Sequence, residues 1–272
     1  MNCHNHIVLI HGTWANDQIW RQMADEFRCR GFTVHTPVLR HHDLPLEEGA
    51  LLIGNVGLQD YVDDLCTFVQ SLDSVPIIVG HSLGGLLAQL VAARCRHKAL
   101  VLLAPGPIPP IFGAYPWALR IFARYFLRWG FWRKPLFPPN WKTWEKGIAN
   151  RQPLIIQREH FSQLCADSGR VYFQMVFWFL DRNHAARLDP KEICAPVLVL
   201  CGEDDRTVNP RIARQTAALY RNGRYVELPS CGHLLIVGRY VEAVMCHIDR
   251  WLVDVVSHVE HQAYGSSSID PS

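Results

Sequence analysis

Short apolar runs alternate along this chain with longer segments in which apolar residues repeat at helical spacing. The short runs are nearly continuous in apolar character, which is typical of strands that are buried on both faces. Such strands, separated by helices, predict an α/β fold with a mostly parallel sheet of about six strands and helices on both of its faces. The expected strands are residues 6–10, 32–37, 76–80, 99–104, 196–202 and 223–229. The expected helices are residues 21–31, 58–72, 83–95, 210–222 and 237–256.

Two segments interrupt this alternation. Residues 105–190 contain much helical pattern, several prolines and no clear strand, and they are too long for a structureless loop. We therefore expect a helical cap at 105–190, inserted into a core formed by residues 1–104 and 191–258. Residues 259–272 contain a run of serines and are expected to form a disordered tail.

Composition excludes several classes of protein. Hydrophobic residues make up 49% of the 272 residues, which predicts a well-filled core, and the net charge of +2 gives no reason to expect a nucleic-acid partner. The start of the chain does not look like a secretory signal, and no apolar run is long enough to span a bilayer. The nine cysteines are an odd number without a CxxC pair, which favours reduced thiols in a cytoplasmic protein. The paired histidines at 4/6 and 41/42 lack a second cluster at ligand spacing, so we expect no metal site.

A serine lies between the expected strand at 76–80 and the expected helix at 83–95, in the sequence Gly80-His81-Ser82-Leu83-Gly84. This order of strand, Gly-x-Ser-x-Gly and helix is typical of a nucleophile elbow, in which a strained turn exposes the serine above the sheet. Glycine is required at both flanking positions because a Cβ there would collide with the turn or the helix. The pattern also occurs in ordinary glycine-rich turns, so by itself it leaves open whether Ser82 is a nucleophile.

A base and an acid follow in the order that such a nucleophile needs. Asp204 and Asp205 come directly after the strand at 196–202, and His233 follows the strand at 223–229. Because the carboxyl ends of parallel strands meet at one edge of a sheet, we expect these residues to lie near Ser82.

Four short motifs occur in the same order along the chain: His-Gly at 11–12, GHSLGG at 80–85, GEDD at 202–205 and CGH at 231–233. On these motifs the chain resembles the α/β-hydrolase superfamily, and specifically its esterase- and lipase-like members. The resemblance implies the α/β-hydrolase fold, no metal or organic cofactor, and a catalytic triad of Ser82, His233 and Asp205. Asp204 is the rival candidate for the acid.

The same resemblance implies an oxyanion hole formed by the backbone N–H groups of Thr13 and Leu83, with His11 supporting the loop. Because the nucleophile is Ser82 and not an aspartate, halide displacement and epoxide opening through an alkyl-enzyme ester are not expected. The antiparallel strands that usually precede the His-Gly strand are expected to be absent or minimal, which leaves about six parallel strands.

The expected cap is rich in aromatic and basic residues. Arg120, Arg124 and Arg128 recur at every fourth position, which predicts one basic stripe along a helix. The stripe is either a solvated face or a surface for an anionic head group, a membrane or a CoA-like phosphate. The apolar run at 171–180 is expected to close the cap over Ser82. The expected pocket residues are Trp14, Trp117, Phe122 and Phe177, although Trp14 fits a core position equally well.

Together these features predict a serine hydrolase that cleaves carboxylic esters of an apolar acyl group through an acyl-enzyme intermediate. The expected partners are a small apolar ester and, through the basic aromatic cap, a membrane or lipid surface in transient contact. Thioester hydrolysis, C–C bond hydrolysis and non-hydrolytic lyase or tailoring chemistry remain alternatives on this scaffold. A ligand-binding receptor that retains the triad is a further alternative. The oligomeric state stays open.

Overall fold

The computed structural model describes residues 5–265, with side chains as far as residue 255. Its main sheet has six strands, all parallel, in the order β2-β1-β3-β4-β7-β8. The strands are β1 (Asn5–Ile10), β2 (Phe32–His35), β3 (Ile77–His81), β4 (Ala99–Leu103), β7 (Val197–Gly202) and β8 (Gly223–Leu228). The prediction of a parallel sheet of about six strands is therefore confirmed.

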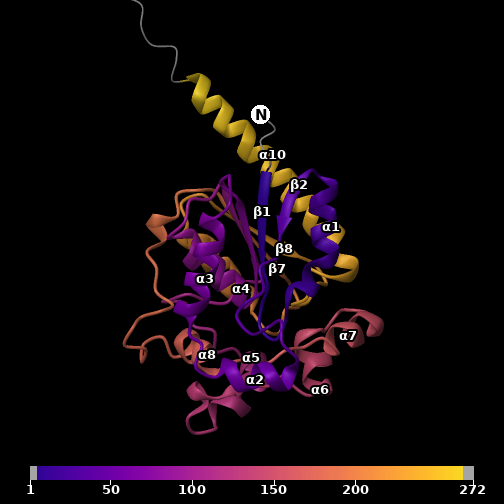
Figure 1. The fold of residues 1–272 in the computed structure, drawn as a ribbon. Helices are drawn as coiled ribbons and strands as arrows, with labels where there is room; N and C mark the ends of the chain where they lie inside the picture. Colours follow the sequence, from indigo (N-terminus) through magenta and orange to yellow (C-terminus); the bar gives the residue numbers. More distant parts are fainter. Residues whose placement is uncertain (1–4, 266–272) are drawn as a thin grey trace, which may run out of the picture.

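Helices cover both faces of this sheet (Figure 1). They are α1 (Arg21–Cys29), α3 (Leu58–Gln70), α4 (Leu83–Ala92), α9 (Pro210–Leu219) and α10 (Val241–Gly265). Helix α3 packs against α4 on one side of β1, and α1 packs against α10 on the other. Every residue of α4 is buried, because this helix lies over the centre of the sheet against β3, β4 and β1.

Helix α10 is longer than the sequence predicted. It begins after a short 3-10 turn, η5 (Gly238–Tyr240), and continues to Gly265, so residues 259–265 are helical where a tail was expected. No glycine or proline interrupts the sequence between Gly238 and Gly265, which lets the helix continue. The remainder of the expected tail, residues 266–272, lies outside the described residues. Within the described part of the chain, none of the helices combines the length and apolar character needed to cross a bilayer.

Most of the segment between β4 and β7 lies beyond the carboxyl ends of the strands, and its last part, with η4, returns along the sheet to the start of β7 (Figure 1). Its helices are α5 (Pro116–Phe126), η2 (Phe131–Arg133), α6 (Trp141–Thr143), η3 (Trp144–Ile148), α7 (Leu154–Phe161), α8 (Gly169–Val176) and η4 (Pro190–Glu192). A small antiparallel pair, β5 (Pro135–Leu136) with β6 (Asp167–Ser168), was not expected from the sequence. Strands of two residues are too short to produce a recognisable pattern.

Two details of this cap differ from the prediction. Arg120 and Arg124 lie on α5, but the helix is capped at Leu127, so Arg128 lies beyond its end and outside the predicted stripe. Helix α2 (Leu46–Ile53) was also not predicted, and it contacts β5 and β6 although it belongs to the amino-terminal half of the chain. The cap region is therefore built from two separate parts of the sequence.

Candidate active site

Ser82 occupies the sharp turn between β3 and α4, with φ 55° and ψ −121°. A Cβ on Gly80 would lie 2.2 Å from the carbonyl oxygen of Gly84, and a Cβ on Gly84 would lie 2.1 Å from that of Ile10. Both distances are far below van der Waals contact, so any residue larger than glycine would force the turn apart. The steric requirement expected from the sequence therefore applies at both glycines. Because Gly84 has no Cβ, the start of α4 can pack directly against the end of β1.

His233 and Asp205 are brought together by the ends of β8 and β7. The Nδ1–H of His233 donates to Asp205 Oδ2 at 2.8 Å, and both side chains are buried. The other carboxylate oxygen, Oδ1, accepts the backbone N–H groups of Thr207 and Val208, each at 2.8 Å. These bonds hold the carboxylate in place and assign the proton of a neutral His233 to Nδ1, which leaves its Nε2 able to accept a proton.

Asp204, the rival acid, lies in a different environment. Its carboxylate forms an ion pair with Arg151, Nε to Oδ2 at 3.0 Å, and its side chain is one-third exposed. Asp205 is thus the aspartate of this pair that contacts His233.

Ser82 and His233 line one small pocket of about 40 Å³, together with Gly12 and Thr13. The loop after β1 comes so close to the serine that a Cβ on Gly12 would lie 2.9 Å from Ser82 Cβ. Within residues 5–255, neither the N–H of Thr13 nor the N–H of Leu83 donates to a protein acceptor. Both N–H groups are therefore free of a protein acceptor, as the donors of an oxyanion hole need to be.

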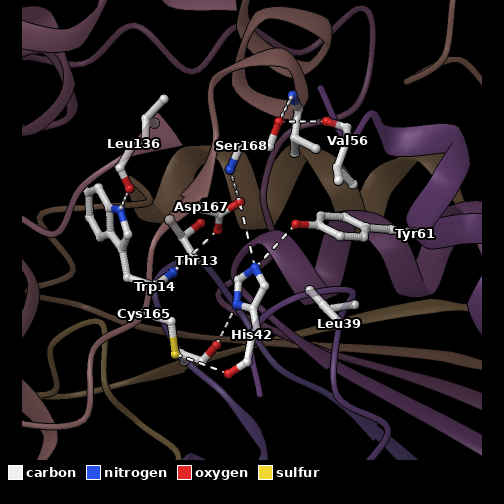
Figure 2. Close-up of polar contacts among 12 residues, drawn as sticks. Thr13, Trp14, Leu39, His42, Val56, Tyr61, Leu136, Cys165, Asp167 and Ser168 are labelled. Carbon is white, nitrogen blue, oxygen red and sulfur yellow. Dashed lines mark hydrogen bonds and ion pairs between the residues drawn. The ribbon is translucent and has the colours of Figure 1, made fainter. Parts of the chain in front are cut away.

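The loop that carries Thr13 is held from the cap (Figure 2). Thr13 Oγ1 lies 2.6 Å from the hydroxyl of Tyr172, and the backbone N–H of Trp14 donates to Asp167 Oδ2 at 3.3 Å. The indole N–H of Trp14 donates to the carbonyl of Leu136 at 3.0 Å. Trp14 itself has φ 59°, an unusual value for a non-glycine residue that these contacts stabilise.

Asp167 is fully buried, and burial raises the pKa of its carboxyl. Its Oδ1 accepts the N–H of Ser168 at 2.6 Å and lies 3.9 Å from Nε2 of His42 (Figure 2). His42 in turn donates from Nδ1 to the carbonyl of Ala15 at 2.7 Å, and its Nε2 forms a hydrogen bond of 3.1 Å with the hydroxyl of Tyr61. The sequence did not predict this buried polar cluster, because its members come from distant segments.

Two further buried histidines support the site. His11 links the loop to the chain after β2: its Nδ1–H donates to Gly12 at 3.1 Å and its Nε2 accepts the N–H of Leu39 at 3.0 Å. Burial, reinforced by His42 nearby, lowers the pKa of His11 to about 3, so it is neutral and acts as the loop support that was expected. His81 was given no role from the sequence. Its Nε2–H donates to the backbone carbonyl of His233 at 3.0 Å, and burial lowers its pKa well below 6.5.

A second pocket of about 350 Å³ also reaches Ser82, and its walls are mostly apolar. It passes between α5, α8 and α9, and its apolar lining includes Ala118, Leu119, Phe122, Phe126, Met175, Val176, Phe177 and Ile212. Four residues, Ser82, Phe122, Tyr172 and Thr207, line both pockets. The serine therefore lies where a small pocket and a large apolar pocket meet.

The structure brings three of the four expected pocket residues to these cavities. Trp14 lines the small pocket, Phe177 lines the large one and Phe122 lines both, stacked on Trp14 with ring centroids 5.5 Å apart. Trp117 lines neither of the two. Its ring instead lies beside the guanidinium groups of Arg120 and Arg206, at 5.1 and 4.6 Å.

Over the described residues, no three His, Cys, Asp or Glu side chains come together in a way that could hold a metal ion. The eight cysteines described, Cys29 to Cys246, are all free thiols.

Comparisons with known proteins agree with this architecture. The family model described as "Alpha/beta hydrolase family" matches residues 7–244. A carbendazim hydrolyzing esterase of Nocardioides sp. (strain SG-4G) is 31% identical over 121 residues, 38% of this chain and 48% of that protein. A pimeloyl-[acyl-carrier protein] methyl ester esterase of Cronobacter sakazakii (strain ATCC BAA-894) is 34% identical over 109 residues, 39% of this chain and 38% of that protein.

Among solved structures, a thermophilic esterase from Thermogutta terrifontis superposes with a TM-score of 0.67 at 21% identity, covering 92% of this chain and 90% of that chain. At this identity the likeness concerns the fold. The match to each of the two curated esterases spans less than half of that protein's length.

Proposed function

This chain belongs to the alpha/beta hydrolase family, and from that premise we propose that it hydrolyses carboxylic esters with Ser82 as nucleophile, His233 as base and Asp205 as the orienting acid. The observation that carries the proposal is the 2.8 Å hydrogen bond from His233 Nδ1 to Asp205 Oδ2, buried at the rim that also holds Ser82. The names of the curated relatives, which are esterases, support the same reaction class.

In the acylation step, Ser82 Oγ attacks the ester carbonyl while Nε2 of His233 accepts the hydroxyl proton. The Asp205 carboxylate holds the imidazole in the required tautomer and stabilises the imidazolium that forms. The N–H groups of Thr13 and Leu83 donate to the oxyanion of the tetrahedral intermediate. His233 then returns the proton to the departing alcohol, which leaves an acyl group on Ser82.

In deacylation, His233 removes a proton from water, and the resulting hydroxide attacks the acyl-enzyme carbonyl in the same oxyanion hole. Collapse of the second intermediate releases the carboxylic acid and returns the proton to Ser82. No cofactor enters either step.

The two pockets suggest how the ester is divided between them. The pocket of about 350 Å³ has apolar walls and suits an apolar acyl chain, since each buried methylene contributes about 0.8 kcal/mol. The pocket of about 40 Å³ beside Thr13 and His233 suits a small alcohol portion. We therefore propose an apolar acyl group joined to a small alcohol as the substrate class.

The test is turnover of a panel of p-nitrophenyl and methyl esters, run beside the corresponding thioesters, with wild type and Ser82→Ala. Hydrolysis of the esters that is lost in Ser82→Ala, together with labelling of wild type by a fluorophosphonate, is the expected result. Ester turnover that persists in Ser82→Ala would overturn the mechanism. Preference for thioesters, or tight ligand binding without multiple turnover, would favour one of the alternative reactions or a receptor.

A further inference from the structure

Several large apolar side chains of the cap point to solvent. Trp129 is 87% exposed and Leu127 is 85% exposed, although both are large apolar residues. They share one short stretch with three exposed cations, Arg128, Arg133 and Lys134. We refer to the exposed apolar side chains of this region and the cations beside them as the aromatic–basic surface. Its members are Phe112, Leu119, Leu127, Trp129, Phe179 and Leu180 with Arg124, Arg128, Arg133 and Lys134.

Ring contacts join the two ends of this surface. Trp129 contacts Trp132 with centroids 5.4 Å apart, and Trp132 contacts Phe173 at 5.7 Å. Phe173 stacks on Phe177 at 5.9 Å, and Phe177 contacts Phe179 at 6.4 Å. The exposed apolar residues after α5 and those after α8 therefore belong to one aromatic layer.

The surface carries positive charge with few carboxylates nearby in the sequence. Residues 104–144 contain no Asp or Glu. The Arg124 guanidinium donates to the carbonyl of Pro138 at 2.9 Å, and Lys134 Nζ donates to that of Trp129 at 3.0 Å. Asp181 lines one cavity together with Arg133, but no ion pair joins Arg128, Arg133 or Lys134 to a carboxylate among the described side chains. These exposed cations are therefore available to an anionic partner.

The large pocket opens within the same surface. Phe112, Leu119 and Phe179 line the pocket of about 350 Å³, and all three are substantially exposed. These three residues therefore form the rim at which the apolar interior, which reaches Ser82, meets the outside of the molecule.

We propose that the aromatic–basic surface docks this protein on an anionic lipid bilayer. Trp129 and Leu127 enter the boundary between head groups and acyl chains, and the neighbouring Arg and Lys side chains contact lipid phosphates. The pocket rim then faces the bilayer, so an apolar molecule passes from lipid to pocket without crossing water. Docking itself is a binding event and does not depend on the proposed hydrolysis.

A bilayer fits this surface better than a second copy of the chain. In a two-fold dimer the same patch faces itself, so Arg128, Arg133 and Lys134 would oppose the same cations of the partner. Like charges brought together in this way oppose association. An anionic lipid surface instead provides phosphates for these cations and an apolar layer for Trp129.

The experiment is flotation of the purified full chain with vesicles of phosphatidylcholine alone and vesicles that also contain phosphatidylserine. We expect binding to the anionic vesicles that weakens as salt is raised. The double variant Leu127→Ser/Trp129→Ser should bind at least about tenfold more weakly, since it removes two large apolar insertions. Arg128→Glu/Arg133→Glu should lose the preference for anionic vesicles.

Ile155→Ser is the matched control, because Ile155 is 75% exposed on α7, which Figure 1 shows well apart from α8. It should bind as wild type does, and thermal unfolding of each variant checks that it is folded. Ser82→Ala should also bind normally, so a failure of the hydrolytic mechanism would leave this result intact. Absence of wild-type binding, or equal binding by Leu127→Ser/Trp129→Ser, would overturn the proposal. Wild-type dimers that dissociate in this double variant would assign the surface to self-association and would equally overturn it.

Discussion

Asp167, a residue of the cap, accepts the backbone N–H of Trp14 at 3.3 Å, and Trp14 belongs to the loop after β1 that carries the expected oxyanion donor (Figure 2). The cap also contributes the N–H of Cys165, which donates to the carbonyl of Trp14 at 2.8 Å. With the contacts of Tyr172 and Leu136, the cap holds this loop through both backbone and side-chain bonds. In this protein the cap is therefore a support for the loop beside Ser82 as well as a cover.

Replacing Asp167 with asparagine should reduce turnover. The two carboxylate oxygens accept two backbone N–H groups, those of Trp14 and Ser168, and an asparagine offers only one oxygen in their place. The loop should shift, and misplacement of a catalytic group by about 1 Å can cost about 100-fold in rate. We expect kcat on a short p-nitrophenyl ester to fall by about 10- to 100-fold with a smaller change in KM.

A purely structural effect of Asp167→Asn would lower stability without this split between kcat and KM. Thermal unfolding of the variant should therefore be measured alongside its kinetics, at a temperature where it is fully folded. Unchanged kcat in folded Asp167→Asn would contradict a positioning role for the cap carboxylate.

Asp205→Asn and Asp204→Asn form a matched pair. Asp205→Asn should lower kcat by about 10⁴-fold, because an amide cannot hold the His233 imidazole in the required tautomer. Asp204→Asn removes only a partly exposed ion pair with Arg151, for which a loss of stability of at most about 1 kcal/mol is expected, with little effect on kcat. Steady-state kinetics of both variants test the assignment, and a larger loss in Asp204→Asn would reverse it.

The sequence predicted the elements that repeat a local pattern. The four central strands were predicted because each is a short, nearly continuous apolar run, whereas β2 and β8 at the edges of the sheet mix apolar and polar residues. Ser82, Asp205 and His233 were singled out because each follows an expected strand within a recognisable motif. The steric need for Gly80 and Gly84 was also foreseeable, since a nucleophile elbow allows no Cβ at those positions.

The supports around the site could not be predicted in the same way. Asp167 contacts Trp14, although the two are far apart in the sequence, and β6 is too short to show periodicity. His42 was noticed only as half of a histidine pair, and nothing local indicates that its partners are Ala15 and Tyr61. Trp117 was expected in the pocket from its aromatic character alone, but the rotation of α5 determines which side chains face Ser82.

Lowering the pH should destabilise the folded protein, and His11 should account for part of this effect. Its pKa is about 3 in the folded protein against 6.5 as an ordinary value, so between these pH values the unfolded chain binds one more proton. The contribution of His11 to the free energy of unfolding is therefore fully present above pH 6.5 and is lost as the pH falls towards 3. The loss is about 1 kcal/mol per pH unit. His81, whose pKa is also lowered by burial, acts in the same direction.

Urea unfolding at several pH values between 7 and 4.5 measures this dependence. Carboxylates also titrate in that range, so the informative quantity is the difference in slope between wild type and His11→Gln. His11→Gln should lower the free energy of unfolding at pH 7. It should also make this free energy depend less steeply on pH, by the slope that corresponds to the uptake of about one proton on unfolding. Identical slopes would show that His11 does not remain neutral in the folded protein.

The width of the large pocket should control which acyl chains are turned over. Ala118 lies on α5, is buried and lines this pocket, so Ala118→Phe places a ring in space that an acyl chain would occupy. We expect kcat/KM for an octanoyl ester to fall by at least about tenfold while the acetyl ester changes little, because each methylene excluded from the pocket forfeits about 0.8 kcal/mol. The measurement is the ratio of kcat/KM for p-nitrophenyl octanoate to kcat/KM for p-nitrophenyl acetate. The control is Ala123→Phe, because Ala123 is a half-buried residue of the same helix that does not line this pocket. An unchanged ratio in Ala118→Phe would mean that the acyl group binds elsewhere, and an equal fall for both esters would indicate a disturbed serine instead of a narrowed pocket.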